Sequence, residues 1–171
     1  MSGTGDLPAD AERAFRVLVL NGPNLDLLGT REPAIYGRET LDQVNAGIAA
    51  RAAELGVSVA FFQSNHEGAL IDRLHRRDFD AAIVNAAGLT HTSVSLRDAL
   101  LAVERPFVEV HLSDPAAREP FRRLNFLEDV AVARFVGLRA RGYILALEEL
   151  ARRWTSGLIP ARAGDAEASG G

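Results

Sequence analysis

The sequence contains no cysteine and no lysine, so all 19 of its basic side chains are arginines. Without cysteine the chain has no disulfide, no thiolate nucleophile and no zinc site with cysteine ligands, and the missing thiols fit a reducing compartment. Without lysine, a Schiff base between a lysine amine and a carbonyl substrate is excluded. We therefore expect a cytoplasmic protein whose chemistry uses other groups.

Long apolar runs and segregated charge are missing as well. No run approaches the roughly 18 consecutive apolar residues of a membrane span, and residues 1–14 carry no basic region followed by an apolar stretch. The net charge is −4 and the arginines are scattered, which does not favour binding to nucleic acid or to an anionic membrane. A small molecule is the expected partner.

Five short segments are nearly continuous in apolar or β-branched residues, which is typical of strands buried in a parallel sheet: residues 15–20, 57–62, 81–84, 107–112 and 130–136. Amphipathic stretches separate most of them, and helices are predicted over residues 40–55, 67–76, 93–103 and 138–154. In the first helix Thr40 and Gln43 form a capping box, and Gly56 ends the helix. This alternation predicts a parallel α/β sheet.

The composition, with 47% hydrophobic and 25% charged residues over 171 positions, is that of an ordinary globular protein. A chain of this length fits one domain with one core. We expect a single α/β domain over residues 15–158. The two ends, residues 1–14 and 159–171, are rich in glycine, alanine, aspartate and serine and are expected to be disordered.

Polar side chains directly follow four of the five predicted strands. In open parallel sheets, ligands bind outside the carboxyl ends of the strands, where loops and helix N-termini gather. Any one of these residues is equally well explained as a turn or cap residue, but four successive polar strand ends favour a binding site. The residues are Asn21, Asn24, Asn65, His66, Asn85, Ser113 and Asp114.

The fourth predicted strand also carries two titratable residues, Glu109 and His111. Because side chains alternate along a strand, both lie on the same face, opposite to Val110. A structural ion pair is one explanation. A catalytic or binding pair is favoured by the position beside the other polar strand ends.

The loop after the first strand is long for a βα connection, which favours an active-site loop. It carries Tyr36, one of two tyrosines in the chain, five residues after Arg31. A nearby cation favours the ionised phenolate of a tyrosine, so Tyr36 is a candidate general base activated by Arg31. Arg31 alone is at the limit of what one cation supplies, and a second cation, or a base acting through water, is expected to assist.

Residues 85–93 combine His91 with three hydroxyl side chains at the start of a predicted helix. A helix cap explains one hydroxyl, and the free backbone N–H groups and other side chains indicate a site for an anion or a polyol. Arg118, Arg122 and Arg123 are candidates for pairing with a substrate carboxylate, which a guanidinium binds with two hydrogen bonds. Each alone is more often a solvated surface residue.

Four blocks stand in order along the chain: NGPNLDLLGTREPAIYG, QSNHEG, NAAGLTHTSVSLRDA and EVHLSDPAAREPFR. In order and spacing they resemble the type II dehydroquinases, and the resemblance covers residues 17–154. It implies a flavodoxin-like fold, a five-stranded parallel sheet with helices on both faces. It also implies a hydro-lyase of the shikimate pathway, in aromatic amino acid biosynthesis. This enzyme eliminates water from 3-dehydroquinate to give 3-dehydroshikimate through an enolate, without cofactor, metal or Schiff base.

The resemblance assigns roles residue by residue. Tyr36 matches the base that removes a C2 proton, and Arg31 matches the residue that keeps it ionised. Asn24 matches the residue that holds a water against the developing enolate oxygen. His111 matches the acid that protonates the departing C1 hydroxyl, oriented by Glu109. The set implied to bind substrate is Asn85, His91, Asp98, Leu112, Ser113 and Arg122.

Within that set, Leu112 and Ser113 match residues whose backbone N–H groups bind the substrate carboxylate. Asp98 matches a residue that reaches the site of a neighbouring subunit, which implies a homo-oligomer, a dodecamer of trimers. Two positions depart from the family pattern: Ala87 stands where glycine is more usual, and Asp114 where asparagine is usual. Ala87 costs little if its φ is negative. Asp114 either adds negative charge near the substrate carboxylate or caps the segment that follows it.

Two other functions remain open. A non-enzymatic flavodoxin-like domain that binds a flavin or a nucleotide is suggested by the fold alone, but the motifs GxGxxG and GxxxxGK[ST] are absent. That function also leaves Tyr36 and the pair of Glu109 and His111 unexplained. A metal-dependent hydrolase is suggested by His91, Glu109 and His111, whose side chains are possible metal ligands.

Overall fold

Five parallel strands form one sheet in the computed structural model, which describes residues 14–160. The strands are β1 (Arg16–Asn21), β2 (Ser58–Gln63), β3 (Ala81–Asn85), β4 (Phe107–His111) and β5 (Ala133–Val136). Their order across the sheet is β2-β1-β3-β4-β5, and every neighbouring pair is parallel. The predicted five-stranded parallel sheet of a flavodoxin-like fold is confirmed.

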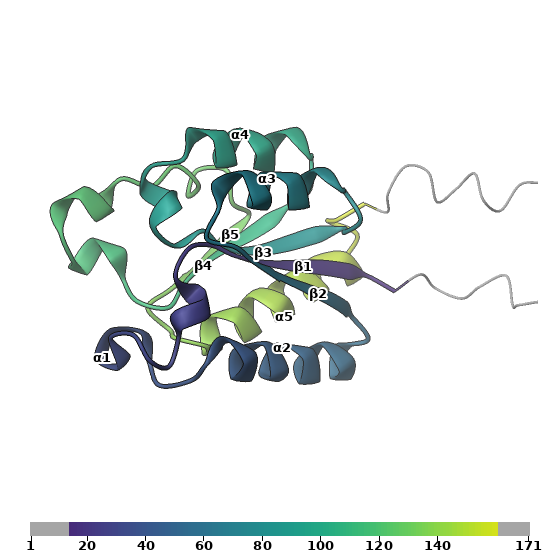
Figure 1. Cartoon of the computed structure of the whole chain (residues 1–171). Coiled ribbons are helices and arrows are strands. Elements are labelled where there is room, and N and C mark those ends of the chain that lie inside the picture. The colour runs from purple at the N-terminus through teal and green to yellow at the C-terminus, as the bar shows by residue number, and fades with distance from the viewer. Residues whose placement is uncertain (1–13, 161–171) are drawn as a thin grey trace, which may run out of the picture.

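Helices cover both faces of this sheet (Figure 1). The helices α2 (Leu41–Leu55) and α5 (Arg141–Thr155) lie on one face, and α3 (Glu67–His75) and α4 (Val94–Ala102) lie on the other. The four predicted helices are therefore confirmed, with small differences at their ends. The loops contain the short helix α1 (Pro33–Tyr36) and four 3-10 turns: η1 (Leu25–Leu27), η2 (Ala87–His91), η3 (Pro115–Ala117) and η4 (Pro120–Arg123).

Helix α2 begins and ends where the sequence pattern indicated. The Gln43 amide N–H donates to Thr40 Oγ1 at 3.2 Å, and the Thr40 amide N–H donates to Gln43 Oε1 at 2.9 Å, so the capping box is complete. Gly56 ends the helix with a φ of 68°, in the left-handed region that glycine adopts without strain. Local sequence chemistry thus sets both ends of α2.

Strand β5 begins later than predicted. The sequence pattern placed its start at Val130, whereas the strand begins at Ala133. The amides of Val130 and Ala131 both donate to the carbonyl oxygen of Leu127. These bonds close a turn, so the Val130 and Ala131 amides do not bond to the sheet, and the first bond to β4 comes from the Val132 amide, which donates to the Phe107 carbonyl oxygen at 2.9 Å.

Alternation along the strands sorts the apolar side chains into two cores, one under each helix layer. In β1, Val17 and Val19 pack with residues of α2 and α5, whereas Leu18 and Leu20 pack with residues of α3 and α4. All four are at most 1% exposed. Burial on both faces explains why the strands read as continuous apolar runs.

The packed region reaches slightly beyond the predicted domain. Ile159, which was expected to belong to the C-terminal tail, is 4% exposed and packs in the core. Phe15 stacks on Trp154 with ring centroids 4.6 Å apart, so the chain just before β1 contacts the end of α5. The expectations for residues 1–13 and 161–171 lie outside the described residues. Between residues 14 and 160 no helix is long and apolar enough to cross a membrane.

The strand order creates a crevice between the loops that follow β1 and β3. After β2 the chain crosses to the other side of β1, and ligands bind at such a change of direction. The last residues of the two strands, Asn21 and Asn85, are register partners. The loops then approach closely at Gly22, where a Cβ atom would lie 2.5 Å from the carbonyl oxygen of Ala86. This is the end of the sheet at which the polar strand ends were predicted to gather.

Ala87, the first residue of η2, has a φ of 52°. The expectation that alanine costs little here depended on a negative φ, so that expectation is wrong. We expect Ala87→Gly to raise the free energy of unfolding by about 0.5–1 kcal/mol, because glycine adopts a left-handed φ without steric strain. Denaturant unfolding at one fixed protein concentration measures the change.

The control for this substitution is Ala50→Gly, at an exposed position in the interior of α2. In a helix interior glycine costs about 1 kcal/mol relative to alanine, so the control is expected to lower the free energy of unfolding. A loss of stability at both positions would contradict the backbone strain inferred at Ala87.

Candidate active site

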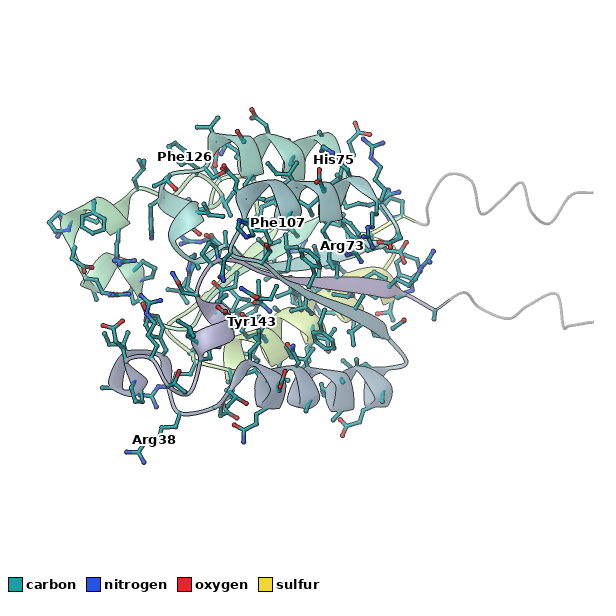
Figure 2. The ribbon with its side chains drawn as sticks, viewed as in Figure 1. Arg38, Arg73, His75, Phe107, Phe126 and Tyr143 are labelled. Atoms are coloured by element: carbon teal, nitrogen blue, oxygen red, sulfur yellow. The ribbon has the colours of Figure 1, made fainter. Side chains whose placement is uncertain are left out.

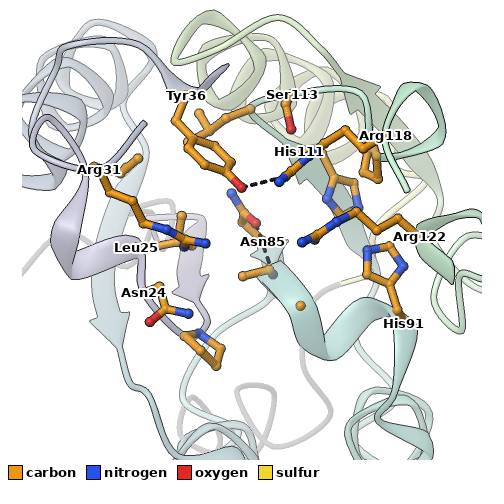
Figure 3. Close-up of a pocket in the computed structure, with 16 residues that line it drawn as sticks. Asn24, Leu25, Arg31, Tyr36, Asn85, His91, His111, Ser113, Arg118 and Arg122 are labelled. Atoms are coloured by element: carbon orange, nitrogen blue, oxygen red, sulfur yellow. Dashed lines mark hydrogen bonds between the residues drawn. The ribbon is translucent and has the colours of Figure 1, made fainter. Parts of the chain in front are cut away.

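A cavity lies over the carboxyl ends of β1, β3 and β4 (Figure 3). Nine of the eleven predicted site residues line it: Asn24, Arg31, Tyr36, Asn85, His91, His111, Leu112, Ser113 and Arg122. The other two are Glu109, which is fully buried and contacts His111, and Asp98, which is exposed on α4. Residues from separate parts of the sequence therefore meet where the strand-end argument placed them.

Tyr36 is the last residue of α1, a single helical turn between residues with left-handed backbone conformation. Gly29 and Glu32 precede the turn with φ values of 87° and 39°, and Gly37 follows it with a φ of 93°. Pro33 occupies the first helical position, where its missing N–H has no partner to lose. The turn places the Tyr36 side chain at the cavity (Figure 3).

Two guanidinium groups flank the Tyr36 ring. Arg118 Nη1 donates a hydrogen bond to the phenol oxygen at 2.6 Å. The guanidinium carbons of Arg31 and Arg118 lie 5.4 and 5.5 Å from the ring centroid. A cationic donor at the phenol oxygen stabilises the phenolate, which is the form that acts as a base. The expected second cation is therefore present in the same chain, and it is Arg118 rather than Arg31 that contacts the oxygen.

Arg118 was predicted only as a candidate partner for a substrate carboxylate, together with Arg122 and Arg123. Arg118 and Arg122 line the cavity, whereas Arg123 is exposed and does not line it. Arg122 Nε donates to the Glu119 carboxylate at 2.6 Å. The contact with Tyr36 joins residues 82 positions apart, so no local pattern indicated which arginine makes it.

His111 and Glu109 form a hydrogen-bonded pair on one face of β4, as alternation predicted. His111 Nε2 lies 2.7 Å from Glu109 Oε1, and Glu109 is fully buried. Burial acts to raise the pKa of the Glu109 carboxyl. The hydrogen bond and electrostatic interaction with His111, together with Asn125 and Arg134, outweigh burial and hold the pKa of Glu109 below its usual value. An ionised carboxylate only accepts, so His111 Nε2 carries a proton and Nδ1 is the ring nitrogen that does not face Glu109.

A buried network that the sequence did not reveal supports Asn85. The Tyr143 hydroxyl donates to Asn21 Oδ1 at 2.5 Å and accepts from Asn85 Nδ2 at 2.9 Å. Asn85 Oδ1 then accepts from the Ala87 amide at 3.2 Å, so both ends of the Asn85 side chain are fixed. Burial raises the pKa of Tyr143, which therefore stays protonated and keeps donating. Tyr143 lies four and seven residues before Leu147 and Leu150 in α5, a spacing that fits core packing equally well, so the sequence carries no signal for these bonds.

The loop that carries Asn24 is held by a neighbouring strand end. Asn24 has a φ of 68°, and its amide donates to Asn65 Oδ1 at 2.8 Å. Asn65 and His66 do not line the cavity. Asn65, which follows β2, thus holds the backbone of the cavity residue Asn24 and does not itself line the cavity.

His91 and Asp114 also form hydrogen bonds within the protein. His91 Nδ1 lies 2.6 Å from the carbonyl oxygen of Leu124, and because a carbonyl only accepts, Nδ1 carries the proton. Asp114 Oδ1 accepts from the Ala116 amide at 3.0 Å and caps η3. The capping role considered for Asp114 is therefore confirmed.

The metal-dependent alternative requires several ligands to converge. In the part of the chain that the structure describes, no group of three or more histidine, cysteine, aspartate or glutamate side chains is placed to hold a metal ion. Glu109 is engaged by His111, and His91 Nδ1 is engaged by the Leu124 carbonyl. The three residues proposed as ligands do not form such a group.

Comparisons with known proteins agree with this geometry. The sequence profile of the family described as dehydroquinase class II matches residues 15–151. The "3-dehydroquinate dehydratase 1" of Ralstonia nicotianae is 55% identical over 141 residues, which are 81% of this chain and 90% of that protein. The "Catabolic 3-dehydroquinase" of Emericella nidulans is 53% identical over 137 residues, which are 79% of this chain and 90% of that protein. The crystal structure of a type II dehydroquinase from Propionibacterium acnes matches with a TM-score of 0.78 and 38% identity, over 81% of this chain and 97% of that one.

The two tyrosines provide a matched pair of substitutions. Tyr143→Phe removes one hydroxyl that serves two buried amides, and we expect it to lower the free energy of unfolding by about 2–3 kcal/mol. Tyr36→Phe removes the same group from a half-buried ring, and we expect a change of about 0.5 kcal/mol or less. Denaturant unfolding followed by the fluorescence of Trp154 measures both. A loss of about 0.5 kcal/mol or less for Tyr143→Phe would show that the Tyr143 network does not support the fold.

Proposed function

The chain belongs to the class II dehydroquinase family and is a 3-dehydroquinate dehydratase, a hydro-lyase, and we propose that Tyr36 and His111 are its base and its acid. The reaction eliminates water from 3-dehydroquinate to give 3-dehydroshikimate, a step of the shikimate pathway. A non-enzymatic role is not favoured, because the matching relatives are named as dehydratases. The observation that carries the proposal is the bond of 2.6 Å between Arg118 Nη1 and the Tyr36 oxygen at the cavity.

In the proposed reaction, the Tyr36 phenolate removes a proton from C2 of the substrate. The electrons of the C–H bond move into the neighbouring carbonyl group and form an enolate. Arg118 and Arg31 favour the phenolate before this step, because both guanidinium groups lie beside the ring. Asn24 is proposed to hold a water molecule that donates to the enolate oxygen, which lowers the free energy of this charged intermediate.

The enolate then collapses with loss of the C1 hydroxyl group. Its electrons form the C1–C2 double bond as the C1–O bond breaks, and His111 transfers a proton to the departing oxygen, which leaves as water. The ionised Glu109 stabilises the protonated imidazole beforehand through the bond to Nε2. Proton exchange with solvent returns both side chains to their starting states. Base and acid are thus separate groups, and neither step requires a cofactor.

The remaining cavity residues are proposed to bind and orient the substrate. Asn85 and His91 offer fixed hydrogen-bonding groups for hydroxyls, because the Asn85 amide and His91 Nδ1 are already held by protein partners. Leu112 and Ser113 are proposed to donate backbone N–H groups to the substrate carboxylate. Arg122 is proposed to add a positive charge for the same carboxylate. All five line the cavity.

We also propose that the protein is cytoplasmic and assembles as a dodecamer of trimers in which Asp98 reaches a neighbouring site. Asp98 lies outside the cavity of its own chain and is exposed on α4. Val94 and Leu101, which share its outward face at helical spacing, are 53% and 48% exposed. An apolar stripe with a central carboxylate suits a contact between copies of the chain.

The catalytic roles are tested by substitution. We expect Tyr36→Phe and His111→Ala to lower kcat by roughly 10²–10⁴-fold, the usual contribution of a general base or acid, while the protein stays folded. The conjugated product absorbs in the ultraviolet, and this absorbance measures turnover. Wild-type turnover in Tyr36→Phe would remove Tyr36 from the mechanism.

Arg118→Met separates activation from binding. Without this guanidinium no cation donates to the phenol oxygen, so we expect kcat to fall by about tenfold or more while KM stays within about twofold of wild type. Arg122→Met removes another cavity arginine without touching Tyr36, and it is expected to raise KM and leave kcat near the wild-type value. An equal fall in kcat in both variants would mean that general charge, and not the Arg118 bond, activates Tyr36.

The shared site is tested by complementation. The Asp98→Ala and Tyr36→Phe variants are each expected to be nearly inactive. Light scattering is expected to show that each variant keeps the mass of the wild-type oligomer. Mixed oligomers from co-expression are expected to regain about one quarter of the wild-type activity, because a site between two different chains can hold both an intact Tyr36 and an intact Asp98. If Asp98 acts within its own chain, no mixed site is complete and activity does not return.

A further inference from the structure

The carboxylate of Glu109 has three side-chain donors, and two of them lie outside the predicted site. Oε1 accepts from His111 Nε2 at 2.7 Å and from Asn125 Nδ2 at 2.8 Å. Oε2 accepts from Arg134 Nε at 2.7 Å. Each carboxylate oxygen thus has a donor besides His111: Asn125 for Oε1 and Arg134 for Oε2. The carboxylate therefore cannot rotate away from the histidine.

The loop that follows Asn125 orients its side chain so that the NH₂ group faces Glu109. Its Oδ1 accepts from the amides of Leu127 and Glu128 at 2.7 and 3.1 Å. An amide side chain with its oxygen engaged in this way can only offer Nδ2 in the other direction. The orientation of Asn125 is therefore determined by the backbone that follows it.

The loop around Asn125 is itself tied to α4 and to η2. Arg97 Nη1, on α4, donates to the carbonyl oxygen of Phe126 at 2.7 Å, and it pairs with Asp129. The Phe126 amide donates to the carbonyl oxygen of Thr90 at 2.9 Å. Phe126, the neighbour of Asn125 in the chain, is thus held through both its amide and its carbonyl group.

Arg134 lies on β5 directly opposite Glu109 in the parallel register. Its Nε donates to Glu109, and its Nη1 lies 2.8 Å from the exposed carboxylate of Glu128. The side chain of Arg134 is 36% exposed, so it joins a buried anion to the surface. A chain of contacting side chains runs from Glu128 through Arg134 and Glu109 to His111.

We propose that Arg134 and Asn125 are positioning residues for the acid of the reaction, acting through Glu109 on the orientation of His111. A carboxylate bound only by His111 could rotate or take up a proton from solvent, and either change would release the ring. With the two additional donors, one Glu109 lone pair stays directed at His111 Nε2, and the ring stays fixed at the cavity. This inference rests on the proposed role of His111 as the acid.

Arg134→Met keeps an apolar stem on the strand and removes the guanidinium. The positioning role predicts a fall in kcat of about tenfold, a part of the roughly 10²–10⁴-fold supplied by a general acid, with KM within about twofold of the wild-type value. Loss of the C1 hydroxyl then becomes the slow step, so the isotope effect on kcat with C2-deuterated 3-dehydroquinate should become smaller. Arg134→Lys, which restores a cationic donor, should recover most of the loss.

Two further variants show whether the effect passes through Glu109. Glu128→Gln removes the negative charge of the outer partner of Arg134 and leaves the bond to Glu109, so kcat is expected to stay within about twofold of wild type. Asn125→Asp keeps the oxygen that the Leu127 and Glu128 amides need but sets a second carboxylate against Glu109. This variant is expected to lose at least as much kcat as Arg134→Met, because two adjacent carboxylates repel each other.

Failure of the positioning role and failure of the proposed function give different results. If the wild-type protein does not dehydrate 3-dehydroquinate, the proposed function is wrong. If the wild-type protein is active and Arg134→Met keeps its kcat, its isotope effect, or both, the positioning role is wrong. A fall in kcat that Arg134→Lys does not recover also overturns it, because any cationic donor at this place should hold the carboxylate.

Discussion

Burial of the parallel sheet on both faces is the constraint on which the rest of the structure depends. The two helix layers exclude water from the strands, so a polar side chain inside the sheet must find its partners within the protein. Asn21, Asn85 and His111 stand at the carboxyl ends of their strands, where the sheet opens to the loops and the cavity. Glu109 is fully buried within β4 and is tolerated because His111, Asn125 and Arg134 supply its hydrogen bonds.

The cavity brings together two groups that need opposite electrostatic surroundings. A tyrosine acts as a base when its anion is stabilised, and Tyr36 lies between the guanidinium groups of Arg31 and Arg118. A histidine acts as an acid when its cation is stabilised, and His111 contacts the ionised Glu109. Tyr36 comes from a loop and His111 from the carboxyl end of β4, so each has its own charged neighbours. In the proposed mechanism this separation lets one cavity hold a proton acceptor beside a proton donor.

The two tyrosines show how surroundings decide the role of one residue type. Tyr143 is surrounded by the core, and burial raises its pKa, so its hydroxyl remains a donor that links Asn21 to Asn85. Tyr36 is half-buried at the cavity and receives a hydrogen bond from a cation. Figure 2 shows Tyr143 in the body of the protein between the sheet and the helices below it. One hydroxyl thus links two buried asparagines beneath the cavity, and the other belongs to the proposed base.

The sequence by itself determined the features that depend on neighbouring residues: the strands, the capping box of Thr40 and Gln43, and the shared face of Glu109 and His111. Its family blocks also named most residues that line the cavity. Tertiary structure alone decided that Arg118 contacts Tyr36, across 82 positions, and that Tyr143 joins Asn21 and Asn85, across 122 and 58 positions. Nineteen arginines offer many possible cations, and only the packing of strands and loops selects the one within hydrogen-bond distance.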